Sequence, residues 1–112
     1  KKPVRIFTHT LDDPQPDHRA VYSTILKAVE DIKYEGNVFS FDIWNPINIR
    51  QRSHAQLYVD ISDTFELKLK ALSCFRSQWL AIGILRWLTY FRAVFNGLSA
   101  GSRFAERFYR IK

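Results

Sequence analysis

The spacing of apolar residues along the chain predicts alternating strands and helices. Residues 4–10 alternate weakly and are rich in β-branched side chains, which predicts a strand. The stretch 11–17 predicts a loop, because its two prolines and three aspartates disfavour regular structure. Apolar residues then recur at helical spacing over 18–32, with Asp17 as the expected N-cap and Gly36 as the stop signal.

The remainder of the chain adds two strands, a helix and further apolar segments. Residues 38–44 and 57–60 read as strands, and a helix is expected after Asp63, with Glu66 at the capping-box position. The end of the chain, 104–111, reads as a turn and a strand. This order of elements is typical of an α/β layered fold, so we expect a partial sheet with helices.

One segment, 79–95, is apolar on nearly every side. Arg86 and Arg92 interrupt it, so we do not expect it to span a membrane. Two explanations stay open: a helix lying on a membrane surface, or a helix covered by other protein, including a second copy of the chain. Asn96 and Gly97 are expected to end this helix.

Composition limits the class of protein. With 112 residues, 46% of them hydrophobic and 25% charged, the chain is suited to one folded domain rather than to disorder. The single cysteine, Cys74, cannot form an internal disulfide, and no signal peptide is recognisable, so we expect a cytoplasmic protein. The sequence contains no methionine and begins Lys1-Lys2-Pro3, from which we expect a piece of a longer protein.

The net charge of +6 is unevenly distributed. Residues 1–66 hold eight Lys/Arg and ten Asp/Glu, a charge of −2, whereas residues 67–112 hold nine Lys/Arg and one acidic residue, a charge of +8. The basic half is either a solvated face or a surface for an anionic partner. No nucleic-acid-binding motif is present, so we do not expect nucleic acid as that partner.

The segment Gln15-Pro16-Asp17-His18 is the strongest candidate for chemistry. It places a histidine at a helix start beyond the end of a strand, the edge at which α/β sheets bind ligands. An imidazole there can bind a metal, with a neighbouring carboxylate orienting the ring. His9 and His54 have less context, and no metal-ligand spacing links the three histidines.

Several stretches resemble the LmbE/PIG-L family of deacetylases, in the same order along nearly the whole chain. The segment from Thr8-His9-Thr10 to Pro16-Asp17-His18-Arg19 resembles the family's His-Pro-Asp-His segment. Further similar stretches are Tyr58-Val59-Asp60-Ile61-Ser62, Lys68-Leu69-Lys70-Ala71-Leu72, Arg76-Ser77-Gln78 and Ala105-Glu106-Arg107-Phe108.

The resemblance implies a Rossmann-like, three-layer fold and zinc-dependent removal of acetyl groups from N-acetylglucosaminyl compounds. It implies that His18 is a zinc ligand and that Asp17 belongs to its supporting shell. Gln15 occupies the position of an auxiliary histidine; an amide can hydrogen-bond an oxyanion but cannot donate a proton as an imidazolium does. The family's N-terminal His-Pro-Asp-Asp segment does not occur in this sequence. The stretch Leu11-Asp12-Asp13 has two aspartates but lacks the histidine.

Residues 1–112 are therefore expected to form a single partial domain, the C-terminal part of a zinc-dependent N-deacetylase, carrying one of three zinc ligands. Such a part would be inactive without the missing half, its partner, and would act on an N-acetylated sugar once completed. The alternative is a non-catalytic relative that oligomerises or binds through its apolar 79–95 helix.

Overall fold

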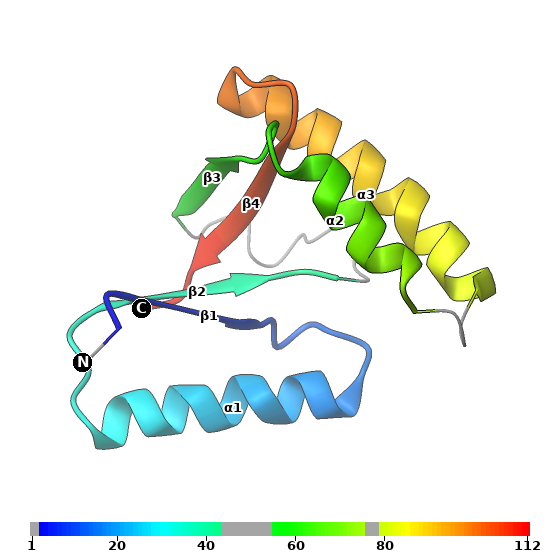
Figure 1. Cartoon of the computed structure of the whole chain (residues 1–112). Helices are drawn as coiled ribbons and strands as arrows, with labels where there is room; N and C mark the ends of the chain where they lie inside the picture. The colour runs from blue at the N-terminus through cyan, green and yellow to red at the C-terminus, as the bar shows by residue number, and fades with distance from the viewer. Residues whose placement is uncertain (1–2, 44–54, 76–78) are drawn as a thin grey trace. The chain divides into compact units, whose positions relative to one another are not determined.

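The computed structural model describes residues 3–43, 55–75 and 79–112 (Figure 1). Strands and helices follow one another in the order that the sequence predicts, which confirms a mixed α/β architecture. The elements are β1 (Arg5–His9), α1 (Pro16–Asp31), β2 (Asn37–Phe41), β3 (Gln56–Asp60), α2 (Phe65–Ser73), α3 (Trp79–Ala100) and β4 (Ala105–Arg110).

The strands form one four-stranded mixed sheet in the order β1-β2-β4-β3. β1 and β2 are parallel, with Ile6 opposite Val38 and His9 opposite Phe41. Parallel strands need a crossover, and α1 supplies it. β4 joins β2 in the antiparallel direction, with Ser40 opposite Tyr109.

The chain divides into two compact units, the first comprising residues 1–57 and 108–112. Within it, α1 runs along β1 (Figure 1). Its core consists of Val29, Tyr34 and Val38, with Ile6, Ile25 and Ile111 packed against them. The Tyr34 hydroxyl donates a hydrogen bond to the carbonyl oxygen of Pro3 at 2.9 Å, so this buried phenol is satisfied.

The second unit comprises residues 58–107. Within it α2 and α3 lie side by side (Figure 1). The rings of Phe65 and Phe104 stack with centroids 4.1 Å apart and pack with Ala93. Apolar residues of α2, α3 and the start of β4 therefore share one core, which fixes the path of the chain into β4.

The predicted helix ends differ from the structure in several places. α1 begins at Pro16 with Gln15 as N-cap, so the prediction that Asp17 is the N-cap is wrong. A proline suits the first helical position because its missing N–H has no helical partner there. The helix ends before Gly36, since Ile32 is the C-cap and Lys33 adopts a positive φ of 48°.

The start of α2 also corrects the sequence prediction. Its N-cap is Thr64, without a side-chain capping bond, so Asp63 does not form the predicted capping box with Glu66. Asp60 organises this turn instead, because its Oδ1 accepts hydrogen bonds from the Ser62 amide at 2.9 Å and the Ser62 hydroxyl at 2.6 Å.

The apolar helix is longer than predicted. α3 continues through Asn96 and Gly97 to Ala100, and Gly101, with a φ of 71°, follows its end. Among the residues that the structure describes, no helix is both long enough and apolar enough to cross a membrane. Trp44, the last residue of the predicted second strand, lies outside the described residues.

Candidate metal centre

The turn from β1 into α1 brings two histidines together. His9 is the last residue of β1, and His18 lies in the first turn of α1. The carboxyl end of a strand and the start of the helix that follows it meet at one edge of the sheet. The two imidazole rings consequently stack, with centroids 3.9 Å apart and planes 8° from parallel.

Asp13 is the buried centre of the connecting loop, with 2% of its surface exposed. Its Oδ1 accepts a hydrogen bond from the Gln15 amide at 2.9 Å. The Arg19 guanidinium donates from Nη1 to the carbonyl oxygens of Asp13 at 2.8 Å and Pro14 at 3.0 Å. These bonds from the helix to the loop backbone hold the carboxylate in place.

The second carboxylate oxygen of Asp13 faces His18. Oδ2 lies 3.0 Å from His18 Nδ1. Neither atom has a hydrogen-bond partner, although both are buried, so their contact falls outside hydrogen-bond geometry. The Nδ1 atom of His9 is likewise buried without a partner. Unsatisfied buried polar atoms are rare, and a binding site for an ion is one physical reason for them.

The three side chains are close enough to share one ion. One ligand atom from each of His9, Asp13 and His18 lies within 4.8 Å of the other two. Two imidazoles and one carboxylate form a donor set that suits zinc, whose catalytic sites use three protein ligands and leave a further position open. These residues therefore fit the metal that the sequence resemblance implies.

The environment keeps His9 in the form that a metal needs. Burial lowers the pKa of His9 below its ordinary 6.5, and the neighbouring His18 lowers it further. The charges of Asp13 and Asp17 act in the opposite direction but do not reverse the shift. A neutral imidazole is the ligating form, so the lowered pKa favours metal binding over proton binding at neutral pH.

The stacked rings also place a requirement on metal binding. The lone pair of an imidazole nitrogen lies in the plane of its ring. Because the planes of His9 and His18 are nearly parallel, their lone pairs do not converge on one point. One ring must turn before both can hold the same ion, so binding would separate the stack.

The predicted site residues have different places in this centre. His18 is part of it, and Gln15 contributes its backbone amide. Asp17 is exposed in the first turn of α1, and the carboxylate beside His18 belongs to Asp13 instead. His54 lies outside the described residues.

Sequence reasoning missed His9 and Asp13 as partners of His18. Their spacing matches no metal-binding motif, and the Leu11-Asp12-Asp13 stretch was expected to play no part because it lacks a histidine. The available signal was positional: a histidine at the carboxyl end of a strand, followed by a short acidic loop and a histidine at a helix start.

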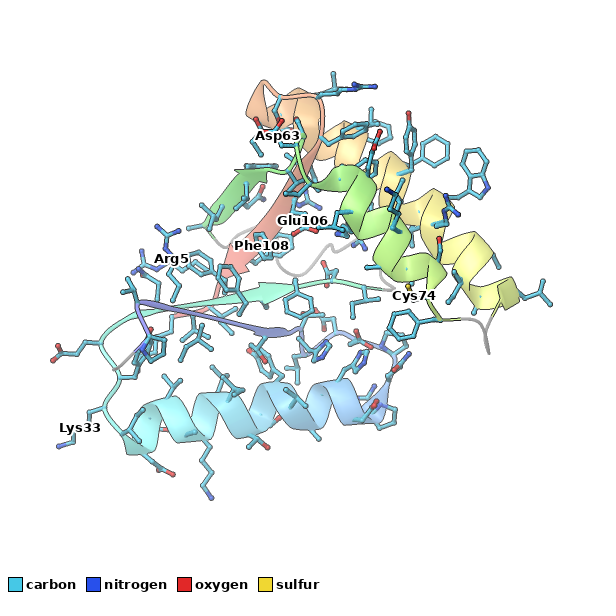
Figure 2. The ribbon with its side chains drawn as sticks, in the orientation of Figure 1. Arg5, Lys33, Asp63, Cys74, Glu106 and Phe108 are labelled. Atoms are coloured by element: carbon cyan, nitrogen blue, oxygen red, sulfur yellow. The ribbon has the colours of Figure 1, made fainter. Side chains whose placement is uncertain are left out.

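Residues of three other stretches that carry the family resemblance contact one another inside the second unit, whereas Arg76-Ser77-Gln78 lies outside the described residues. The Ser62 hydroxyl accepts a hydrogen bond from the Phe104 amide at 3.2 Å, and Asp60 orients that hydroxyl. Lys68 of α2 forms an ion pair with Glu106 of β4, labelled in Figure 2. These residues join α2 to the start of β4, so their role in this structure is to hold the unit together.

Comparison with known proteins identifies a fold and no family. No protein-family model matches the chain, and no curated protein matches it. Its structure is similar to the crystal structure of the conserved protein TT1542 from Thermus thermophilus, with a TM-score of 0.75 and 21% sequence identity. The match covers 98% of this chain and 52% of that chain. The chain therefore shares the fold of about half of TT1542.

Proposed function

We propose that this chain carries the zinc site of an N-deacetylase that acts on N-acetylated sugars. The observation that supports the proposal is the convergence of His9, Asp13 and His18, each of which has a buried polar atom that makes no hydrogen bond. The order of the family-like stretches along the sequence supports the assignment to a deacetylase. It also supports a Rossmann-like form of the α/β fold. The sequence resemblance implies that His18 is the only zinc ligand in these residues, whereas the proposed site has three.

Each residue of the site has a role in this proposal. His9, Asp13 and His18 hold the ion, while Arg19 and the Gln15 amide keep the loop and its carboxylate in position. A bound zinc would supply Lewis acidity, which polarises an acyl carbonyl and lowers the pKa of water. The Gln15 side chain can donate a hydrogen bond to a carbonyl oxygen but cannot protonate a leaving amine.

Metal binding is tested by titrating the protein with zinc against a chromogenic chelator. We expect one zinc per chain, and an affinity lowered at least about 100-fold in His9→Ala, His18→Ala and Asp13→Asn, since even supporting residues of metal sites contribute about 10–100-fold. Asp17→Asn is the matched control, because Asp17 is exposed on the same turn of α1 as His18. Equal affinities for Asp13→Asn and Asp17→Asn would contradict the site.

Opening of the histidine stack gives a second measurement of the same site. Stacked rings shift each other's proton resonances, so we expect the imidazole protons of His9 and His18 to move together when zinc is added. Resonances that stay in place at saturating zinc would show that the ion binds elsewhere.

The deacetylase activity is tested by acetate release from N-acetylglucosaminyl compounds with zinc present. We expect release by a longer protein that also supplies the N-terminal half, and none by this chain alone; a chelator and His18→Ala should each abolish the release. Because general acid catalysis is worth about 10²–10⁴-fold, Gln15→His should raise the rate by at least 10-fold. Stoichiometric zinc binding without acetate release would reject the deacetylase and leave a metal-binding protein.

A further inference from the structure

α3 carries a continuous row of exposed apolar side chains. Figure 2 shows aromatic rings standing clear of this helix. The row, called here the α3 stripe, has side chains that are each between 53% and 76% exposed: Leu80, Ile84, Trp87, Phe91, Phe95 and Leu98. Isolated exposed apolar residues are ordinary, but a contiguous row of this size marks an interaction surface.

The spacing of the stripe places it on one side of the helix. Its members are separated by steps of three and four residues, which at about 100° per residue confines them to an arc of roughly 80°. The opposite side of α3 is already used, because Ala93 is buried with Phe65 and Phe104. The stripe therefore faces away from the core of its own unit.

The stripe itself carries no charge. Arg86 and Arg92 lie at least about 100° around the helix from the centre of the stripe. Arg86 also donates a hydrogen bond from Nη1 to the Ser73 hydroxyl at 3.3 Å, on the side of α2. A helix that lies on an anionic membrane presents cations along the edge of its apolar face. The placement of these arginines favours a protein partner over a lipid surface.

Four of the six stripe residues form pairs that are symmetric about position 89. Leu80 and Leu98 are equidistant from this position, and so are Trp87 and Phe91. Two copies of α3 packed antiparallel with a two-fold axis at this point would therefore place each leucine against a leucine and each Trp87 against a Phe91. An interface between identical chains must be self-complementary in this way.

The exposed area is sufficient for a stable dimer. An aromatic side chain offers about 150–250 Å² when it is fully exposed, so the three aromatic and three aliphatic side chains of the stripe, each 53–76% exposed, together offer roughly 700 Å² per chain, which is close to the usual contribution of one partner in a stable complex. We propose that a second copy of this chain docks antiparallel on the α3 stripe.

Sedimentation equilibrium of the full chain from 1 to 100 µM tests the proposal. We expect a dimer, and a monomer for the double variant Trp87→Glu with Phe91→Glu, whose carboxylates face each other across the two-fold axis. The control is Ile32→Glu, which introduces the same charge at an apolar residue 60% exposed at the end of α1. A monomeric wild-type protein, or control and double variant behaving alike, would overturn the proposal.

Disulfide trapping tests the antiparallel direction. In a Cys74→Ser background, Leu80→Cys and Leu98→Cys proteins are mixed and oxidised, and linked peptides are identified by mass spectrometry. We expect links between position 80 and position 98. Links of each position to itself would indicate a parallel pair and overturn the proposed arrangement. Binding of a monomeric protein to vesicles containing phosphatidylserine would overturn the second copy as the occupant.

Discussion

Phe65 links three elements of the second unit through its ring. It is 2% exposed, stacks on Phe104 at 4.1 Å and lies 5.9 Å from the ring of Tyr90. We predict that Phe65→Ala lowers the free energy of unfolding by about 3–5 kcal/mol, because the substitution leaves a cavity between packed aromatic rings. Leu67→Ala is the matched control: its side chain is 67% exposed on the same helix, and a change within about 0.5 kcal/mol is expected.

Urea unfolding followed by circular dichroism measures both variants. Similar losses for Phe65→Ala and Leu67→Ala would show that the stacked pair is not the centre of this core.

Asp60 gives a prediction for pH. Hydrogen bonds from the Ser62 hydroxyl and then from the Ser62 amide lower the pKa of this exposed carboxyl below its ordinary 3.8. The folded state therefore favours the charged form. Asp60 stabilises the fold above pH 3.8, and this contribution is lost as the pH falls through the lowered pKa.

Ser62→Ala should raise the pKa of Asp60 toward 3.8, because it removes the larger of the two causes. An NMR titration of the carboxyl carbon measures the shift. Ser73→Ala serves as control, since the Ser73 hydroxyl donates to the carbonyl oxygen of Leu69. An unchanged Asp60 titration in Ser62→Ala would contradict the assignment of the hydrogen bond.

Within a single element, two glycines of α3 are predicted to respond in opposite ways to alanine. A Cβ at Gly97 would meet backbone oxygens of Ser102 at 2.6 Å and Arg103 at 2.7 Å, so Gly97→Ala should lower the free energy of unfolding by about 1–3 kcal/mol. A Cβ at Gly83 meets nothing, so Gly83→Ala should raise it by about 1 kcal/mol through helix propensity.

Thermal unfolding of the two variants in parallel measures this difference. Stabilisation by Gly97→Ala would mean that the chain after α3 does not return closely over the helix end.

The contrast between these two glycines shows what the sequence of a single helix does not predict. A glycine after an apolar run is typical of the end of a helix, yet Gly97 lies inside α3. The position requires a glycine because the backbone of Ser102 and Arg103 passes too close for a Cβ. Periodicity placed the strands and helices because it reports which face is buried. It could not report a close approach between segments.

The start of α2 shows the same limit. The sequence predicts that Asp63 caps this helix, but Thr64 lies between Asp63 and the helix. Asp60 organises the turn instead, and the Ile61 amide donates a hydrogen bond to the Phe104 carbonyl oxygen at 3.0 Å, which fixes the turn from a distant part of the sequence. Such a contact has no local signature.

In the candidate site, the sequence identified His18 and the sheet edge but not its companions. The stacking of His9 on His18 and the burial of Asp13 depend on the path of the loop and on the bonds from Arg19 to its carbonyls. A sequence motif identifies metal ligands only at fixed spacings along the chain, whereas the path of this loop depends on tertiary contacts.

At the scale of the whole molecule, the two units should respond differently to zinc. All three candidate ligands belong to the first unit. We predict that zinc at about 100 times its dissociation constant slows amide hydrogen exchange in β1 and α1 by up to about 100-fold, while exchange in α2 is unchanged. His18→Ala should abolish the difference. Equal protection of both units would show that they open together or that zinc binds the second unit as well.

The proposed metal ligands lie between positions 9 and 18, on one strand end, one loop and one helix start. Bringing them together closes only a short stretch of backbone, which carries a small entropic cost. Nothing from a distant part of the sequence has to supply a donor atom. Such a segment is portable: grafted onto another β–loop–α junction of the same geometry, with Arg19 retained to brace the loop, it should transfer its metal affinity to an unrelated host.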